Sequence, residues 1–405
     1  MAVINSNYTV TSTKTELEGM LHGTTLAQIT SVNSVFNRAA RQVLLDIDPA
    51  ETKRISQTNT IYENVFDYSA PTDLKGDKVI DVRPQVSRRM SDIFIKRYGQ
   101  EFDTTKNING DNKIFNVKYN NGTKSLRIAS PLTNSAILLN MLDSVTGNGT
   151  WSGSGATNLV ADSINYADGS ASLKFDLSSG ADPTTSYIEN STFSSVDLSD
   201  LEGASALFLW VYLPTASGFT SISLRWGSSS ANYWSVTATT THEGNSFNNG
   251  WNLIRFDWTA STTETGTADS SAVDYARISF TFNGTAQSGV RANGLWNRLG
   301  VVYDIEYYSK YLFASSAGVY QETVDDDSNY INLDTDAYNV FLWQLALQAA
   351  HQQHSQNANF DINYYIKNYD EAKNKYIRQY PSEVQKGQSQ YYIMPNRGYG
   401  GYYNK

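Results

Sequence analysis

The spacing of apolar residues predicts helices near the N-terminus. Thr13 and Glu16 fit a capping box that opens a first helix. Apolar residues then recur every three or four positions from Leu26 to Ile47, and Pro49 stops the pattern. These signals predict two amphipathic helices before residue 50.

A second pair of helices is predicted near the C-terminus. Asp334 or Thr335 can cap a helix whose apolar positions reach Ala349, and another runs from Asp361 until Pro381 ends it. Two amphipathic helices bury little surface alone. We therefore expect the N-terminal and C-terminal pairs to pack together as a four-helix base.

Between the helical segments, the apolar residues follow the alternation of β-strands. Residues 78–84 predict a strand, and residues 115–119 and 125–128 predict a hairpin. Residues 136–310 contain short strands separated by Gly, Ser and Thr turns, which is typical of a β-sandwich or jelly roll. The clearest of these strands are expected at residues 172–177, 207–213, 222–226, 233–236, 252–257 and 276–282.

The predicted fold class is therefore α+β and multidomain. Residues 1–135 would form a helical pair with a small β-sheet, the first half of the base. Residues 136–310 would be an inserted antiparallel β-sandwich, and residues 311–386 the second helical pair of the base. Residues 387–405, rich in Tyr and Gly, would form an extended tail.

Composition and charge exclude several functions. The 405-residue chain has 40% hydrophobic residues and no cysteine, which favours a folded protein without disulfides or thiolate chemistry. Residues 136–310 carry 7 Lys and Arg against 16 Asp and Glu, so we expect no binding of nucleic-acid phosphates there.

No signal peptide is expected, and no stretch approaches the ~18–20 apolar residues of a membrane span. The absence of cysteine permits a cytoplasmic origin, and we expect no membrane partner.

The histidines and carboxylates form no recognisable catalytic or metal motif. His351 and His354 lie one helical turn apart without further ligands nearby, so a solvated helix end is favoured over a metal site. The run Asp325–Asp327 lacks the ligand spacing of a calcium loop, which favours an acidic turn or a subunit contact.

No pair of sandwich carboxylates stands out as acid and base. The candidates are Asp257, Asp274 and Asp304, and their spacing singles out no pair. The chain also lacks a nucleophile elbow, a P-loop and a dinucleotide fingerprint. We expect no catalytic residue, no metal site and no cofactor.

Aromatic residues of the sandwich are the main candidates for a binding surface. Trp and Tyr rings can stack on sugars, but the alternative is that most of them fill the core, as the Leu and Phe neighbours of Trp210 favour. Tyr233 and Trp234 are adjacent, so their side chains point to opposite faces of a strand. From the set Trp210, Trp226, Tyr233, Trp234, Trp251 and Trp258, we choose Trp226, Tyr233 and Trp234 as candidate ligand-binding residues.

The middle segment resembles jelly-roll domains of the carbohydrate-binding-module type. The resemblance rests on the stretches Gly169–Asp176, Val196–Ser199, Leu209–Pro214 and Asn249–Asn252. It implies a sandwich fold across the middle of the chain. A glycan ligand is one expectation, although such domains also bind proteins or decorate a surface.

The outer segments resemble neck proteins of tailed phages, above all the head-to-tail adaptor. The shared order is a helical pair, the stretch Tyr68-x-x-Pro71-x-Asp73-Leu74, a strand at residues 79–83, a helix at residues 338–350 and a Tyr-rich tail. The large insertion departs from compact adaptors. The resemblance implies a non-catalytic protein with a place in the virion, at the neck or tail.

The resemblance also implies partners. The protein would form a homo-oligomeric ring between the portal protein and the tail proteins, around a channel through which genomic DNA passes without sequence-specific binding. The sandwich would project outward, and the tail would contact neighbouring subunits. The alternatives are a tail-fibre, tail-tip or capsid decoration protein whose sandwich binds host glycans, and, third, a glycan-degrading enzyme. The tail residues expected at subunit contacts are Tyr391, Tyr392, Tyr399, Tyr402 and Tyr403.

Overall fold

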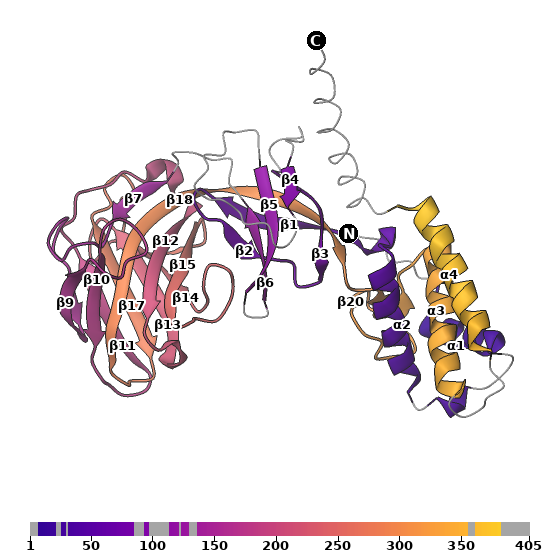
Figure 1. Cartoon of the computed structure of the whole chain (residues 1–405). Coiled ribbons are helices and arrows are strands. Elements are labelled where there is room, and N and C mark those ends of the chain that lie inside the picture. Colours follow the sequence, from indigo (N-terminus) through magenta and orange to yellow (C-terminus); the bar gives the residue numbers. More distant parts are fainter. Residues whose placement is uncertain are drawn as a thin grey trace, which may run out of the picture. The chain divides into compact units, whose positions relative to one another are not determined.

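The chain is mostly β-structure and forms two compact units. The computed structural model describes residues 7–21, 26–29, 31–84, 93–96, 113–120, 123–128, 136–354 and 361–381. We call the first unit, Met1–Asn59, Pro71–Arg83 and Asp304–Lys405, the helical unit. The second, Thr60–Ala70 and Pro84–Tyr303, is the sandwich unit (Figure 1). Among the described residues, no helix is both long and apolar enough to cross a membrane.

Helices from both ends of the chain share one hydrophobic core in the helical unit. Phe36 and Phe341 lie with their ring centroids 6.0 Å apart, and the Tyr365 hydroxyl donates to the backbone oxygen of Met20 over 3.1 Å. Apolar residues of all four elements are buried together, as helical periodicity dictates. The helices are α1 (Val10–Met20), α2 (Val32–Asp46), α3 (Thr335–His354) and α4 (Ile362–Gln379) (Figure 1).

The predicted start of the first helix was wrong by one turn. Thr9 is the N-cap, and its side chain accepts a hydrogen bond from the backbone of Ser12. Thr13 lies inside α1, where its hydroxyl is buried and bonds to the Tyr338 hydroxyl over 2.9 Å. A Thr–x–x–Ser pair therefore caps the helix, and Thr13 instead provides a partner for a buried phenol.

Short strands complete the helical unit. A three-stranded sheet has the order β20-β19-β21, and two longer strands pair with β18, which contributes residues to both units. These strands are β1 (Lys53–Tyr62), β3 (Leu74–Pro84), β18 (Gln287–Ser309), β19 (Phe313–Ala314), β20 (Tyr320–Gln321) and β21 (Tyr330–Ile331).

The sandwich unit contains two large antiparallel layers. The six-stranded sheet has the order β16-β14-β13-β17-β11-β8, and the eight-stranded sheet runs β15-β12-β18-β10-β9 with β1, β3 and β7 also paired to β18. Its strands are β7 (Ile137–Asn140), β8 (Ser152–Ser154), β9 (Ala156–Asp162), β10 (Ser172–Leu177), β11 (Thr184–Asn190), β12 (Ala204–Leu213), β13 (Phe219–Gly227), β14 (Tyr233–Ala238), β15 (Gly250–Thr259), β16 (Thr263–Thr265) and β17 (Tyr275–Phe282).

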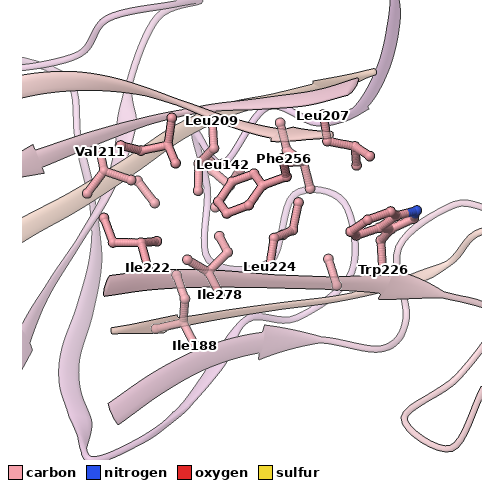
Figure 2. Close-up of a cluster of buried hydrophobic side chains, with 14 of the residues drawn as sticks. Leu142, Ile188, Leu207, Leu209, Val211, Ile222, Leu224, Trp226, Phe256 and Ile278 are labelled. Carbon is pink, nitrogen blue, oxygen red and sulfur yellow. The ribbon is translucent and has the colours of Figure 1, made fainter. Parts of the chain in front are cut away.

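Alternate residues of facing strands fill the sandwich core. Figure 2 shows Leu207, Leu209 and Val211 of β12 directed toward Ile222 and Leu224 of β13. All are fully buried, whereas Ser223, which lies between the two β13 residues, is partly exposed. The six strands expected from alternation are thus confirmed, because each has one face on this core.

A four-stranded sheet of order β2-β6-β5-β4 also belongs to the sandwich unit. The predicted hairpin is confirmed by antiparallel pairing of β5 with β6, and Arg127 on β6 forms an ion pair with Asp67 on β2. The Tyr68 hydroxyl donates to the backbone oxygen of Val65 over 2.8 Å. The strands are β2 (Asp67–Ser69), β4 (Ile93–Lys96), β5 (Lys113–Asn120) and β6 (Thr123–Ile128).

A buried asparagine on β18 hydrogen-bonds to the backbone of neighbouring segments of the sandwich unit. Asn293 on β18 is fully buried, and its amide nitrogen donates to the backbone oxygens of Met141 and Ala171 over 3.0 and 2.9 Å. Its amide oxygen accepts from the backbone nitrogens of Ala167 and Asp168. One side chain thus satisfies four backbone groups of two chain segments, at Met141 and at Ala167–Ala171.

Candidate functional site

The outer face of the six-stranded sheet gathers aromatic and charged side chains from four neighbouring strands. We call it the binding face and define it by Tyr187 and Glu189 of β11, Arg225 of β13, Tyr233 of β14, and Tyr275 and Arg277 of β17. Period-two alternation points these residues away from the core, opposite to Ile188, Trp226 and Ile278.

The strand register arranges the binding face in rows. Tyr233, Gly227 and Tyr275 are consecutive partners across β14, β13 and β17. A Cβ atom at Gly227 would lie 2.3 Å from the backbone oxygen of Asn232, so only glycine fits between the two tyrosines. The tyrosine rings lie 6.3 Å apart, with Tyr275 buried and Tyr233 partly exposed. Burial raises the pKa of the Tyr275 hydroxyl, which keeps it a hydrogen-bond donor.

The next row is charged. Arg225 pairs with Arg277 across β13 and β17, and Arg277 pairs with Glu189 across β17 and β11. The Arg277 guanidinium donates to one oxygen of Glu189 from Nε and Nη2 over 2.9 and 2.7 Å. The same guanidinium lies 4.1 Å from the ring centre of Tyr187, and that of Arg225 lies 4.7 Å from the ring centre of Tyr233. Each tyrosine ring is therefore braced by an arginine.

A third row carries hydroxyl groups. Thr237, Ser223, Ser279 and Tyr187 follow one another across β14, β13, β17 and β11. The hydroxyls of Ser223 and Thr237 lie 2.8 Å apart and hydrogen-bond each other. The face thus combines flat rings with donors and acceptors held by a sheet, an arrangement suited to a flat ligand rich in hydroxyl groups.

Two of the three residues chosen from the sequence lie in the core, which corrects the expectation that they face a ligand. Trp226 is 0% exposed and Trp234 is 3% exposed. They are register partners on β13 and β14, stack at 6.4 Å between ring centres and pack around Trp258. Tyr233 points the other way and lies on the binding face, as alternation requires.

Trp210 and Trp251 lie outside the core, on the outer side of the eight-stranded sheet. Both are partly exposed, and Trp210 has the opposite phase to the buried Leu209. The core interpretation of Trp210 is therefore corrected. The Trp251 indole donates to Asn165 over 3.0 Å, which assigns it to bracing a loop.

The candidate metal and acid–base residues do not come together. Asp326 accepts from the backbone of Ser328, and Asp327 pairs with Lys14 at 2.5 Å, so the acidic run forms a turn with an ion pair. His351 is exposed on α3. Within the described ranges, no three His, Asp or Glu side chains are placed to hold a metal ion.

The three sandwich carboxylates are also separate. Asp257 pairs with Arg255 on the eight-stranded sheet, and Asp274 precedes a strand of the six-stranded sheet. Asp304 belongs to the helical unit. The five tail tyrosines from Tyr391 to Tyr403 lie outside the described residues, so their assembly role stays a prediction.

Of the residues of the binding face, only Tyr233 was predicted from the sequence, where tryptophans formed most of the candidates. Arg225 and Arg277 alternate with apolar residues in two strands that were predicted correctly. This alternation already indicated that both arginines point away from the core. Their placement beside Tyr233 depends on which strands pair and in which register, and a strand's own pattern carries no such information.

No protein-family model and no curated protein matches the chain. Solved structures similar to it include a family 11 carbohydrate-binding module from Clostridium thermocellum in complex with a β-1,3-1,4-mixed-linked tetrasaccharide. That match has 13% identity and a TM-score of 0.26, and covers 41% of this chain and 96% of the module. A family 30 carbohydrate-binding module matches with 9% identity and a TM-score of 0.29, over 42% of this chain and 97% of its own. At these TM-scores the neighbours do not decide what this chain binds.

Proposed function

We propose that the protein is a carbohydrate-binding virion component and that the binding face holds the glycan. The observation that carries the proposal is that two partly exposed tyrosine rings each pack against a guanidinium group on a polar, hydroxyl-bearing sheet surface. Tyr187 packs against Arg277, and Tyr233 packs against Arg225. Sugar rings present C–H faces that pack on aromatic rings and hydroxyl edges that bond to fixed polar groups.

Two features favour a carbohydrate over a protein partner. The two rings lie on strands separated by β13 and β17. They are not surrounded by exposed aliphatic side chains, since their neighbours on the face are Ser, Thr, Arg and Glu and the buried ring of Tyr275. Protein interfaces place a hydrophobic core inside a polar rim. A polar sheet with separate ring platforms better matches a chain of sugar units.

A glycan array probed with the full chain tests this proposal. We expect binding to a limited set of oligosaccharides, reduced on the order of 10-fold or more by Tyr233→Ala, which removes one platform. Tyr166→Ala is the matched control, because Tyr166 is 44% exposed in the sandwich unit but lies in a loop beside the eight-stranded sheet. Binding by no glycan, or equal loss in both variants, would refute the assignment.

A second proposal concerns the helical unit, which we assign to assembly as a ring of the neck or tail. The proposal is supported by the hydrophobic core that helices from both ends of the chain share, because this core forms only when the N-terminal and C-terminal segments pack together. The motif residue Asp73 accepts from the hydroxyls of Tyr307 and Ser309, both over 2.7 Å, so it serves structure. The partners proposed are other copies, the portal protein and tail proteins, around passing DNA.

Particle imaging tests the assembly proposal. We expect a symmetric ring of this protein beneath the portal, and removal of residues 387–405 should leave a folded chain that no longer assembles. Density only at capsid faces or fibre tips would exclude the adaptor and leave a decoration or fibre protein. An unfolded truncation product would show that the tail is part of the fold.

A further inference from the structure

The charged row of the binding face contains two arginines and a single carboxylate. Arg225 and Arg277 are register partners on adjacent antiparallel strands, so their side chains lie next to each other on one face. Like charges in this position destabilise a sheet. Glu189 neutralises Arg277 through two hydrogen bonds. The row therefore keeps one surplus positive charge.

Arg225 differs from the other arginines of residues 136–310. Arg255 and Arg291 form ion pairs with Asp257 and Asp162 at 3.0 and 2.8 Å, and Arg298 donates to the backbone oxygen of Glu63 over 2.7 Å. Within the part of the chain that the structure describes, the Arg225 guanidinium has no hydrogen bond or ion pair and contacts the Tyr233 ring.

The surplus charge is unusual because this segment is acidic. Residues 136–310 contain 16 Asp and Glu against 7 Lys and Arg, so carboxylates outnumber cations more than twofold. Among the described residues, the Arg225 guanidinium contacts the Tyr233 ring but has no carboxylate partner, although the segment is rich in carboxylates. The planar fork of arginine is suited to bidentate binding of a carboxylate or sulfate.

We propose that the glycan of the binding face is acidic and that its carboxylate or sulfate group binds Arg225 while the same sugar unit packs on Tyr233. This inference rests on the proposed carbohydrate function and specifies its ligand class. Arg225 gives charge recognition, Tyr233 gives the ring platform, and the Glu189–Arg277 pair remains neutral beside them. The neighbouring Ser235, register partner of Arg225, lies within the same row for the sugar hydroxyls.

The test uses two matched pairs of ligands with the full chain in titration calorimetry. Oligogalacturonate is compared with its methyl ester, which removes the carboxylate charge, and dextran sulfate oligomers are compared with dextran oligomers. The pairs distinguish a carboxylate source from a sulfate source. We expect one acidic ligand to bind on the order of 10-fold or more tighter than its neutral partner at low salt, with the difference shrinking at high ionic strength.

Single-residue variants then test whether Arg225 causes the preference for the acidic ligand. Arg225→Gln should remove the preference for the acidic ligand, and Arg225→Lys should restore part of it, since charge returns without the bidentate fork. Arg255→Gln is the control, because it deletes an arginine from the other sheet, and it should leave the preference unchanged. Unchanged thermal unfolding of each variant verifies folding.

The outcomes separate the two proposals. Equal binding of acidic and neutral ligands that Tyr233→Ala abolishes and Arg225→Gln spares would overturn the acidic ligand and keep the carbohydrate function. A preference that persists in Arg225→Gln would also overturn the role of this residue. Failure of all four ligands together with a blank glycan array would overturn both.

Discussion

Arg277 donates from Nε and Nη2 to a single oxygen of Glu189, over 2.9 and 2.7 Å. The two side chains are 20% and 28% exposed, so solvent screens the pair only in part. The pair fixes one arginine of the binding face and leaves its neighbour Arg225 as the surplus charge. The charge balance of the face is therefore set by Glu189.

Replacement of Glu189 by Gln should change stability and binding in opposite directions. Loss of the ion pair should lower the free energy of unfolding by about 1 kcal/mol, because the pair is partly solvated. Removal of the carboxylate should tighten binding of an acidic glycan several-fold, because Arg277 then adds its charge to that of Arg225. Urea denaturation and titration calorimetry measure the two effects. Weaker binding of the acidic ligand would show that Glu189 itself contacts the sugar.

His242 should make the stability of the chain dependent on pH. It is 7% exposed, lies between the rings of Tyr68 and Phe208 at 5.0 and 5.4 Å, and neither ring nitrogen has a hydrogen-bond partner among the described residues. Burial, with a smaller contribution from Arg255, lowers its pKa from 6.5 to about 3. Between pH 6.5 and about pH 3, His242 is therefore protonated in the unfolded chain but neutral in the folded chain. The free energy of unfolding consequently falls as the pH drops below 6.5.

The variant His242→Phe isolates this contribution because a phenyl ring preserves the packing and cannot be protonated. Between pH 7 and pH 5, the wild type should lose about 2 kcal/mol more unfolding free energy than the variant. Urea denaturation at the two pH values measures the difference. Parallel losses in both proteins would mean that His242 is protonated equally in the folded and unfolded states.

Asn293→Asp should destabilise the sandwich strongly. The replacement sets a carboxylate oxygen against the backbone oxygens of Met141 and Ala171, where the amide nitrogen now donates. A buried charge facing two acceptors should cost about 3–5 kcal/mol of unfolding free energy. Asn248→Asp, the same change at an exposed position, should cost less than about 0.5 kcal/mol. Similar midpoints in urea for the two variants would contradict the role of Asn293.

The core and the binding face should respond differently to truncation. Trp226→Ala removes a fully buried ring from the tryptophan cluster and should lower the unfolding free energy by about 3–5 kcal/mol. Tyr233→Ala removes a partly exposed ring and should cost about 1 kcal/mol or less, yet it should weaken glycan binding. Circular dichroism in urea measures the first effect. Comparable destabilisation by both changes would place Tyr233 in the core.

Local patterns in the sequence predicted the individual strands of the sandwich better than the pairing and register between them. Leu207, Leu209 and Val211 alternate with residues of the other face, and this alternation was enough to place β12. The positions of Trp226 and Trp234 were predicted wrongly, because burial of a tryptophan depends on which face of its strand it occupies. Trp226 lies on the same face of β13 as the buried Leu224, and Trp234 is the register partner of Trp226 on β14. The binding face could not be assembled beforehand, because its rows exist only across strand pairs.

The most direct test of the central claim is a crystal structure of the full chain with an oligosaccharide selected by the array. We predict electron density for a sugar ring packed on Tyr233, with its polar groups directed toward Arg225 and the hydroxyl row of Ser223 and Thr237. Density on the eight-stranded sheet instead, beside Trp210 or Trp251, would contradict the assignment of the binding face.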